Sequence, residues 1–279
     1  MSEKQRSIKE SVQYEGIGLH SGRPVRMILK PAPANTGIVF VRTDLSGRPS
    51  VKAAIENVTS TMRATTLEKG AAKVSTVEHL LAAFYGMRID NCIVELNFQE
   101  PPVGDGSAAV FVDLMKQAGI VELEAERTIC YIKQSHAIYD NEGQRFILIL
   151  PYDGLRLTYT SINSHPMLGK QFEDFIVTDK VFEEDISRAR TIGFMKEIEQ
   201  LQAMGLAKGG NLENCIVYDD TTCLSKLRFD DELVRHKMLD ILGDLFLLGP
   251  IRGHIIALNS SHELNSRLSR DIRKELGEI

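Results

Sequence analysis

The chain has 279 residues, of which 43% are apolar and 25% charged, and its net charge is −5. This composition is that of a globular protein with a sizeable core and excludes disordered, collagen-like and disulfide-stapled small proteins, while the length predicts about two domains. The lack of a basic surplus excludes the electrostatic footprint of a nucleic-acid-binding protein. No stretch approaches the ~18 uncharged residues of a membrane span and no apolar leader follows the first residues, so we expect a cytoplasmic protein.

The first half of the chain predicts strands and helices in a definite order. Apolar and β-branched runs bounded by Pro and Gly predict strands over 25–29 and 38–42, in the pattern of a hairpin. An apolar stripe of helical period begins at Val77, a strand follows over 92–96, and a second helix follows over 108–119. The predicted order is therefore two strands, a helix, a strand and a helix.

The second half repeats this order of elements. Strands are predicted over 146–150 and 155–160, a helix with an apolar stripe carries Val234, and a strand over 255–258 precedes the last helix. A repeat of this length indicates two copies of one supersecondary unit. We therefore predict an α+β fold made of two similar domains.

The boundary between the domains is expected at the charged segment 122–127, which gives domains over 1–126 and 127–279. The second domain also carries an insertion over about 191–214 that has no counterpart in the first. It reads as a helix followed by the flexible loop Gly209–Gly210. Additions to a repeated scaffold usually lie on one face, so we expect this insertion to serve the function.

Three polar side chains share one face of the helix in the second half. His236, Asp240 and Asp244 lie four residues apart, and His79 occupies the place of His236 in the first half. A pseudo-twofold arrangement of the domains would bring the two helices together, so His79, His236 and Asp240 are candidate ligands of one divalent metal with an open fourth position. Asp244 would then orient a ligating or catalytic histidine. The alternative is a solvated helix face with unrelated polar residues.

Two further residues admit a structural and a catalytic interpretation. Glu78 completes a capping box that begins at Ser75, yet it also lies beside a candidate ligand, where a base for water is needed. His262 lies between a strand and the last helix, either as a helix-entry residue or as a catalytic group. The segment Asp105–Ser107 reads as a turn and N-cap, and it does not fit a phosphate-binding loop.

Seven segments distributed along the chain carry motifs of a known family. They are 15–22, 31–37, 75–81, 102–107, 187–191, 234–240 and 243–245. In this order they resemble the zinc-dependent UDP-3-O-acyl-N-acetylglucosamine deacetylases of lipid A biosynthesis, with a coverage of about residues 8–270. The resemblance implies two α+β domains that form a β-α-α-β sandwich with the active site between them.

The resemblance also implies the metal site and the acid–base groups. His79, His236 and Asp240 would bind Zn²⁺, although the same donor set also suits Fe²⁺. Glu78 would act as general base on the attacking water. His262 would be the protonated group that assists the leaving amine, and whether Glu78 alone carries the proton is left open.

Further residues are assigned to the substrate by the same resemblance. Asp244 would orient His262, Thr191 would help to stabilise the oxyanion, and Lys237 would contact the substrate. The insertion would line a hydrophobic passage for the acyl chain of a small-molecule acylated amino-sugar nucleotide. The implied substrate-binding residues are Thr191, Ile192, Gly193, Gly209, Gly210, Lys237 and Ser261.

The chain departs from the family pattern at several positions. The departures at the expected pocket wall are Ile192, Ser261 and Gly104. Where the family holds the diphosphate and uracil, Asn259 replaces a basic residue, Leu150 a lysine of some members, and Asn163 an aromatic residue. Two alternatives therefore stay open, a paralogous zinc deacetylase acting on another N-acetylated sugar or sugar nucleotide, and a non-catalytic acyl-sugar-binding protein. The retained acid, base and metal ligands argue against the second alternative.

Overall fold

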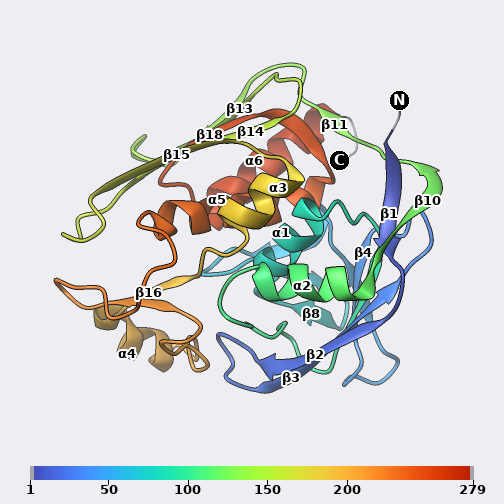
Figure 1. The fold of residues 1–279 in the computed structure, drawn as a ribbon, viewed down its shortest axis with the longest axis horizontal. Coiled ribbons are helices and arrows are strands. Elements are labelled where there is room, and N and C mark those ends of the chain that lie inside the picture. The colour runs from blue at the N-terminus through green and yellow to red at the C-terminus, as the bar shows by residue number, and fades with distance from the viewer. Residues whose placement is uncertain (1–2, 277–279) are drawn as a thin grey trace.

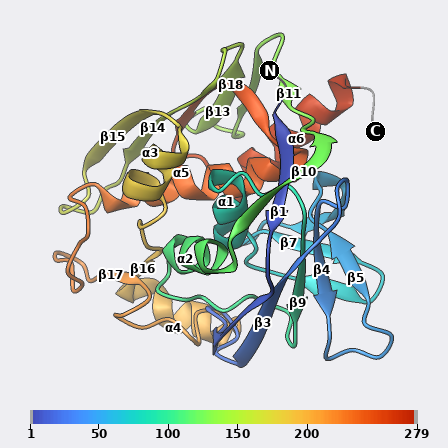
Figure 2. The same cartoon turned by 45° about the vertical axis from the view of Figure 1, so that its right-hand side comes forward.

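The computed structural model describes residues 3–276 and has an α+β fold in which helices lie between two sheets (Figure 1 and Figure 2). The first sheet contains five strands in the order β2-β3-β9-β4-β5. Their bounds are Val12–Ile17, Pro24–Pro31, Cys92–Leu96, Ile38–Arg42 and Ser50–Lys52 in that order. Buried and less buried residues alternate along β3, β9 and β4, because one face of this sheet packs on the helices.

The second sheet repeats the arrangement of the first. Its strands lie in the order β12-β13-β18-β14-β15, and the short β11 also pairs with β18. The bounds of β12, β13, β18, β14, β15 and β11 are His136–Tyr139, Phe146–Leu150, Ile251–Leu258, Leu155–Ile162, Lys170–Ile176 and Cys130–Tyr131. Two domains of the same strand order confirm the predicted α+β class.

The expected hairpins are wrong, although the strands that were to form them exist. In each half the strand that follows the helix, β9 or β18, lies between the two earlier strands. It runs antiparallel to the first of them and parallel to the second. A turn rich in Pro and Gly shows only that the chain reverses its direction. A strand that comes later in the sequence can insert between the two earlier strands and pair with an unpaired edge of each.

Four helices fill the layer between the sheets. They are α1 Glu78–Gly86, α2 Ala109–Ala118, α5 Glu232–Leu245 and α6 His262–Glu275. The insertion forms α4 Met195–Ala203 at the side of this layer (Figure 1), and the single-turn α3 Asp179–Val181 precedes it. None of the helices described between residues 3 and 276 is long and apolar enough to cross a membrane.

Short sheets complete the fold. The strand β1 Lys4–Ile8 pairs with β10 Ile120–Glu126. Most of the charged segment expected at the domain boundary therefore belongs to a strand that lies beside β1. The boundary after residue 126 stays a prediction. Three strands, β6 Val58–Ser60, β7 Thr66–Lys69 and β8 Ala72–Val74, form one more sheet. At the start of the insertion β16 Ile192–Phe194 pairs with β17 Ile216–Tyr218, which follows the insertion.

The central helices α1 and α5 are buried on almost every side. All nine residues of α1 and twelve of the fourteen residues of α5 are buried. A helix that is buried all round packs in the interior of the molecule, and its polar side chains then need internal partners. The alternative of a solvated polar face on α5 is therefore wrong, because His236, Asp240 and Asp244 are all buried.

The crossing of α1 and α5 depends on a glycine. A Cβ atom at Gly243 would lie 2.0 Å from the carbonyl oxygen of Glu78. Replacing this helical glycine with alanine would add about 1 kcal/mol of helix propensity, but the clash with a backbone atom must move the two helices apart. We expect Gly243→Ala to lower the free energy of unfolding by about 1–3 kcal/mol and to impair turnover, measured by urea unfolding and by steady-state kinetics. A more stable variant would contradict this account.

Candidate active site

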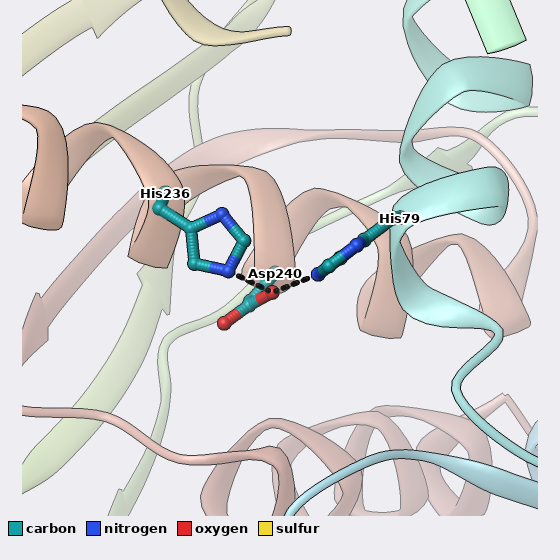
Figure 3. A group of neighbouring side chains, drawn as sticks. All are labelled: His79, His236 and Asp240. Carbon is teal, nitrogen blue, oxygen red and sulfur yellow. Dashed lines mark ion pairs between the residues drawn. The ribbon is translucent and has the colours of Figure 1, made fainter. Parts of the chain in front are cut away.

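Three side chains converge where α1 meets α5 (Figure 3). His79 comes from the first turn of α1, and His236 and Asp240 come from consecutive turns of α5. Asp240 Oδ1 lies 3.4 Å from His236 Nε2 and 3.7 Å from His79 Nε2. One donor atom from each residue lies within 4.8 Å of the others. The two halves of the chain thus contribute to one group that could hold a metal ion.

The protonation states of the two histidines suit metal binding. His236 Nδ1 lies 3.0 Å from the carbonyl oxygen of Ala189, which can only accept, so this nitrogen carries the proton and Nε2 keeps its lone pair. Burial, followed by the neighbouring histidine, lowers the pKa of His79 to about 3, and burial also lowers the pKa of His236. Both rings are therefore neutral at neutral pH, the form that can bind a metal ion.

Asp240 provides an oxygen that has no other partner. Its Oδ1 is buried and accepts no hydrogen bond, while its Oδ2 accepts one from Lys237 Nζ at 2.8 Å. Burial opposes the charged form of Asp240, but the interactions with His236, Lys237 and His262 outweigh it and lower its pKa. A carboxylate oxygen facing the lone pair of His236 is repelled by it unless a cation lies between them. Two imidazole nitrogens and one carboxylate oxygen fit Zn²⁺, and Fe²⁺ also suits them.

Glu78 does not form the expected capping box, and that prediction is wrong. The helix begins at Glu78 itself, and no side chain caps its N-terminus. The Ser75 amide donates instead to the carbonyl of Gln99, and Glu78 Oε2 accepts from the Thr65 amide at 3.0 Å. The polypeptide around residue 99 offers Ser75 a backbone partner, which leaves the Glu78 carboxylate free to face the cavity beside the candidate metal ligands.

The environment of Glu78 suits a general base. The residue is 3% exposed, and burial, together with the charges of Asp244 and Asp240, raises its pKa to about 7 against the opposing charge of His262. One oxygen is held by Thr65, so the other is available for a proton. A carboxyl group that titrates near neutral pH can both take and release a proton during turnover.

His262 is held by a buried carboxylate. It is the first residue of α6, and its Nδ1–H donates to Asp244 Oδ2 at 2.8 Å. Asp244 also accepts from Asn265 Nδ2 at 2.8 Å and from Thr65 Oγ1 at 2.5 Å. Burial opposes the charged imidazole, but Asp244 and Glu78 outweigh this effect and raise the pKa of His262 to about 10. The structure therefore pairs Asp244 with His262 and not with a candidate metal ligand.

These residues open onto a cavity of about 810 Å³. Glu78, His79 and His262 belong to its polar wall, and apolar side chains of the insertion form another part of the lining, namely Met195, Ile198, Leu201 and Leu212. The helix α4 lies apart from α1 and α5 (Figure 1), so the apolar part extends away from the candidate metal ligands. Ligand cavities usually measure about 300–1,000 Å³, and this one has room for a sugar with a chain attached.

Most of the residues assigned to the substrate line this cavity. They are Thr191, Ile192, Gly193, Gly210, Lys237 and Ser261. Gly209 does not line it, because this residue packs against the carbonyl oxygen of Gly18, where a Cβ atom would lie only 2.2 Å away. Asp244 lies behind His262. The flexible-loop interpretation of Gly209–Gly210 thus overlooked a tight backbone contact.

The three departures at the nucleotide positions do not line the cavity. Asn259 bonds through both side-chain atoms to the backbone of Ile162, and Asn163 Oδ1 accepts from the His165 amide. Two arginines that sequence reasoning missed, Arg63 and Arg145, do line it. Cationic side chains are therefore present at the cavity, although not at the expected positions.

Several residues that hold the candidate site residues in place were not predicted from the sequence. Thr65 joins Glu78 to Asp244, the Ala189 carbonyl fixes the ring of His236, and Asn265 holds Asp244. Only Asn265 left a signal, since it lies three residues after His262 and therefore on the same side of α6. The other two contacts join residues far apart in the sequence.

Comparison with known proteins gives consistent matches. A family model described as UDP-3-O-acyl N-acetylglycosamine deacetylase matches residues 5–274. Proteins named UDP-3-O-acyl-N-acetylglucosamine deacetylase include that of Pasteurella multocida, 46% identical over 276 residues, which are 96% of this chain and 90% of the relative. Those of Marinobacter nauticus and Bdellovibrio bacteriovorus are 45% and 44% identical over 279 and 271 residues, covering 98% and 96% of this chain and 90% and 89% of the relatives.

Proposed function

The chain belongs to the family of UDP-3-O-acyl-N-acetylglucosamine deacetylases, and on that premise we propose how its residues hydrolyse the N-acetyl group. It is an N-deacetylase of lipid A biosynthesis that releases acetate from UDP-3-O-acyl-N-acetylglucosamine. One observation supports the mechanism, namely that side chains from both halves, which together could hold a metal ion, lie beside Glu78 and His262 at the same cavity.

We propose that His79, His236 and Asp240 hold the metal and that Glu78 is the general base. A divalent metal at this position supplies Lewis-acid polarisation and lowers the pKa of a water molecule. The free oxygen of Glu78 takes a proton from the attacking water, and the water oxygen adds to the acetamide carbonyl carbon. The Thr65 amide keeps the other oxygen in place, so that the base is oriented before the substrate arrives.

His262 is the general acid of the proposed mechanism. Asp244 holds Nδ1–H, which leaves the Nε2 side of the ring for the leaving amine. When the carbon–nitrogen bond of the tetrahedral adduct breaks, Nε2–H protonates the nitrogen, and acetate and the free amine result. Thr191 contributes to stabilising the oxyanion, and Lys237, which also fixes Asp240, contacts the sugar.

The rate should depend on pH as a bell-shaped curve. Burial raises the pKa of Glu78 to about 7, while Asp244, against the effect of burial, raises that of His262 to about 10. Activity therefore rises as Glu78 loses its proton and falls as His262 loses its own. A bound dication lowers both pKa values and moves the curve to lower pH without removing either limb. Steady-state kcat from pH 5 to pH 11 measures the curve, and a flat profile would contradict the assignment.

Replacing Asp244 with asparagine tests the partner of His262. The amide keeps the shape but removes the negative charge that raises the pKa of the imidazole. An adjacent opposite charge is worth about 1–3 pKa units, so we expect the alkaline limb of the kcat profile to move down by about this amount. The acidic limb should move less. An alkaline limb unchanged from that of the wild type would show that His262 is not the titrating acid.

A paralogous activity on another N-acetylated sugar or sugar nucleotide is the second candidate. It is favoured by Asn259, Leu150 and Asn163 at the nucleotide positions, none of which lines the cavity. Against it, Arg63 and Arg145 do line the cavity and offer charge to a diphosphate.

The experiment that tests the proposed function compares two substrates on the metal-loaded protein. One is UDP-3-O-acyl-N-acetylglucosamine, and the other is the same acyl sugar without UDP. We expect a clear loss of kcat/KM without UDP, because cationic side chains at the cavity lose their phosphate partners. Equal rates on both substrates would overturn the nucleotide assignment and favour the paralogous activity.

A further inference from the structure

The turn between β2 and β3 is built around a buried carboxylate and has no role in the mechanism above. Glu100, which is 1% exposed, accepts from the amides of His20 and Ser21 at 2.8 and 3.0 Å. Thr76 Oγ1 also donates to it at 3.1 Å. Gly18 packs so closely that a Cβ atom there would lie 2.3 Å from Glu100. The position of His20 is thus fixed by the first domain.

The insertion of the second domain docks on this turn. The Gly209 amide donates to the carbonyl of Leu19 at 2.9 Å, and the Lys208 amide donates to that of His20 at 3.2 Å. The Ala207 amide donates to the imidazole Nδ1 of His20 at 3.3 Å. His20 therefore joins the first domain to the segment that leads into the apolar part of the cavity.

These contacts decide which ring nitrogen of His20 carries the proton. An amide N–H can only donate, so Nδ1 is the acceptor and the neutral ring carries its proton on Nε2. Burial lowers the pKa of His20 and favours this neutral form. His165 shows the same pattern, since its Nδ1 accepts from the Met167 amide, but its Nε2–H donates to the carbonyl of Asp219.

The Nε2–H group of His20, in contrast, has no such partner. Nε2 is buried and makes no hydrogen bond of normal geometry, since the backbone of Arg63 interacts with the ring only weakly and affects the pKa of His20 less than burial and Glu100 do. A buried donor without an acceptor is costly, and it persists where a ligand completes it. The ring lines the cavity and is close enough to His262 for their charges to interact. The unpaired donor therefore lies between the acid–base pair and the insertion.

The chemistry of the substrate places an acceptor in the same region. The scissile amide and the acyl ester are attached to neighbouring carbons of the sugar ring. When the amide lies at the metal ligands and the acyl chain lies along the insertion, the ester carbonyl falls between them. An ester carbonyl accepts hydrogen bonds and donates none, so it complements an N–H group.

We propose that His20 is a specificity-determining residue whose Nε2–H donates to the ester carbonyl oxygen of the 3-O-acyl group. This inference rests on the proposed function, and it adds the recognition of the acyl linkage to the cleavage of the amide. A sugar without this carbonyl leaves the buried donor unpaired in the complex, so the cavity discriminates against it.

The test compares the ester substrate with its 3-O-alkyl ether analogue, which lacks only the carbonyl oxygen. The readout is the ratio of kcat/KM for the two substrates within one protein, which does not depend on the folded fraction. His20→Asn keeps an acceptor near the Ala207 amide but removes the donor, and His20→Gln offers a donor near the place of Nε2. We expect the wild type to prefer the ester about tenfold, His20→Asn to lose the preference, and His20→Gln to regain part of it.

Each outcome bears on a different claim. A wild type without the preference, or a His20→Asn variant that keeps it, overturns the role of His20 while the deacetylase stands. A metal-loaded wild type that hydrolyses neither substrate overturns the proposed function, and this inference with it. Melting temperature and metal content of the variants, expected near those of the wild type, show that the cavity itself is preserved.

Discussion

Glu78→Gln is expected to lower kcat by about 10²–10⁴-fold, the range typical of a lost general base. The amide retains the size of the side chain and can still accept from the Thr65 amide, which Glu78 Oε2 contacts at 3.0 Å. It cannot take a proton from water. KM should change little, because the substrate contacts are retained, and the acidic limb of the pH profile should vanish. Steady-state kinetics on the acylated UDP-sugar measures both effects.

Glu263→Gln is the matched control for this variant. Glu263 also lines the cavity, but it is exposed and pairs with Arg267 at 3.5 Å on the same helix. Surface pairs of this kind contribute little, about 0–1 kcal/mol, so we expect kcat within about twofold of the wild type. If Glu78→Gln were as active as Glu263→Gln, Glu78 would not be the base.

His79→Ala should remove most of the metal affinity of the protein. The variant leaves His236 and Asp240 on α5 without the ligand from the first domain. Removing a residue that only supports a metal ligand typically lowers the metal affinity about 10–100-fold. The loss of a ligand itself should therefore lower the affinity more than about 100-fold. Competition with a chromogenic chelator measures the affinity, and kcat should fall along with the metal content.

His254→Asn controls for the loss of a histidine as such. His254 lies on β18 of the second sheet, where its Nε2 is 2.8 Å from Thr158 Oγ1, and it is not one of the three candidate metal ligands. Its replacement should leave the metal affinity unchanged. Unaltered affinity in His79→Ala would contradict the ligand assignment and leave α5 as the sole source of ligands.

Local elements could be predicted where the sequence signal is itself local. The strands over 38–42, 92–96 and 146–150 have the predicted bounds, because Pro, Gly or polar residues end each apolar run. The strand expected over 255–258 begins earlier, at Ile251, and includes Gly253, which interrupts the apolar run in the sequence. In the fold a Cβ at Gly253 would lie 2.8 Å from the side chain of Ile149, so the glycine is needed inside the strand.

Pairing and capping could not be predicted because distant segments decide them. The strands on either side of β9 and β18 carry the signature of a hairpin, and only the later arrival of those strands separates them. The expected capping box at Ser75 is absent for the same reason, because the Ser75 amide donates its hydrogen bond to the carbonyl of Gln99 and not to Glu78.

The candidate site was predictable as far as the repeat reached. Equivalent positions in the two halves led to His79 and His236, and the helical spacing led to Asp240. The contacts that prepare these groups were not predictable. Thr65 Oγ1 reaches Asp244 across 179 positions, and the Ala189 carbonyl reaches His236 across 47. Such contacts depend on how the two domains pack.

The central claim is that the two halves build one metal site at which an N-acetyl group is hydrolysed. The most direct test titrates the metal-free protein with Zn²⁺ and follows the release of acetate from UDP-3-O-acyl-N-acetylglucosamine. We expect the rate to rise in proportion to added metal up to one equivalent per chain, with one free amine formed for each acetate. Full acetate release from the metal-free protein, or no release at one equivalent of Zn²⁺ or Fe²⁺, would contradict it.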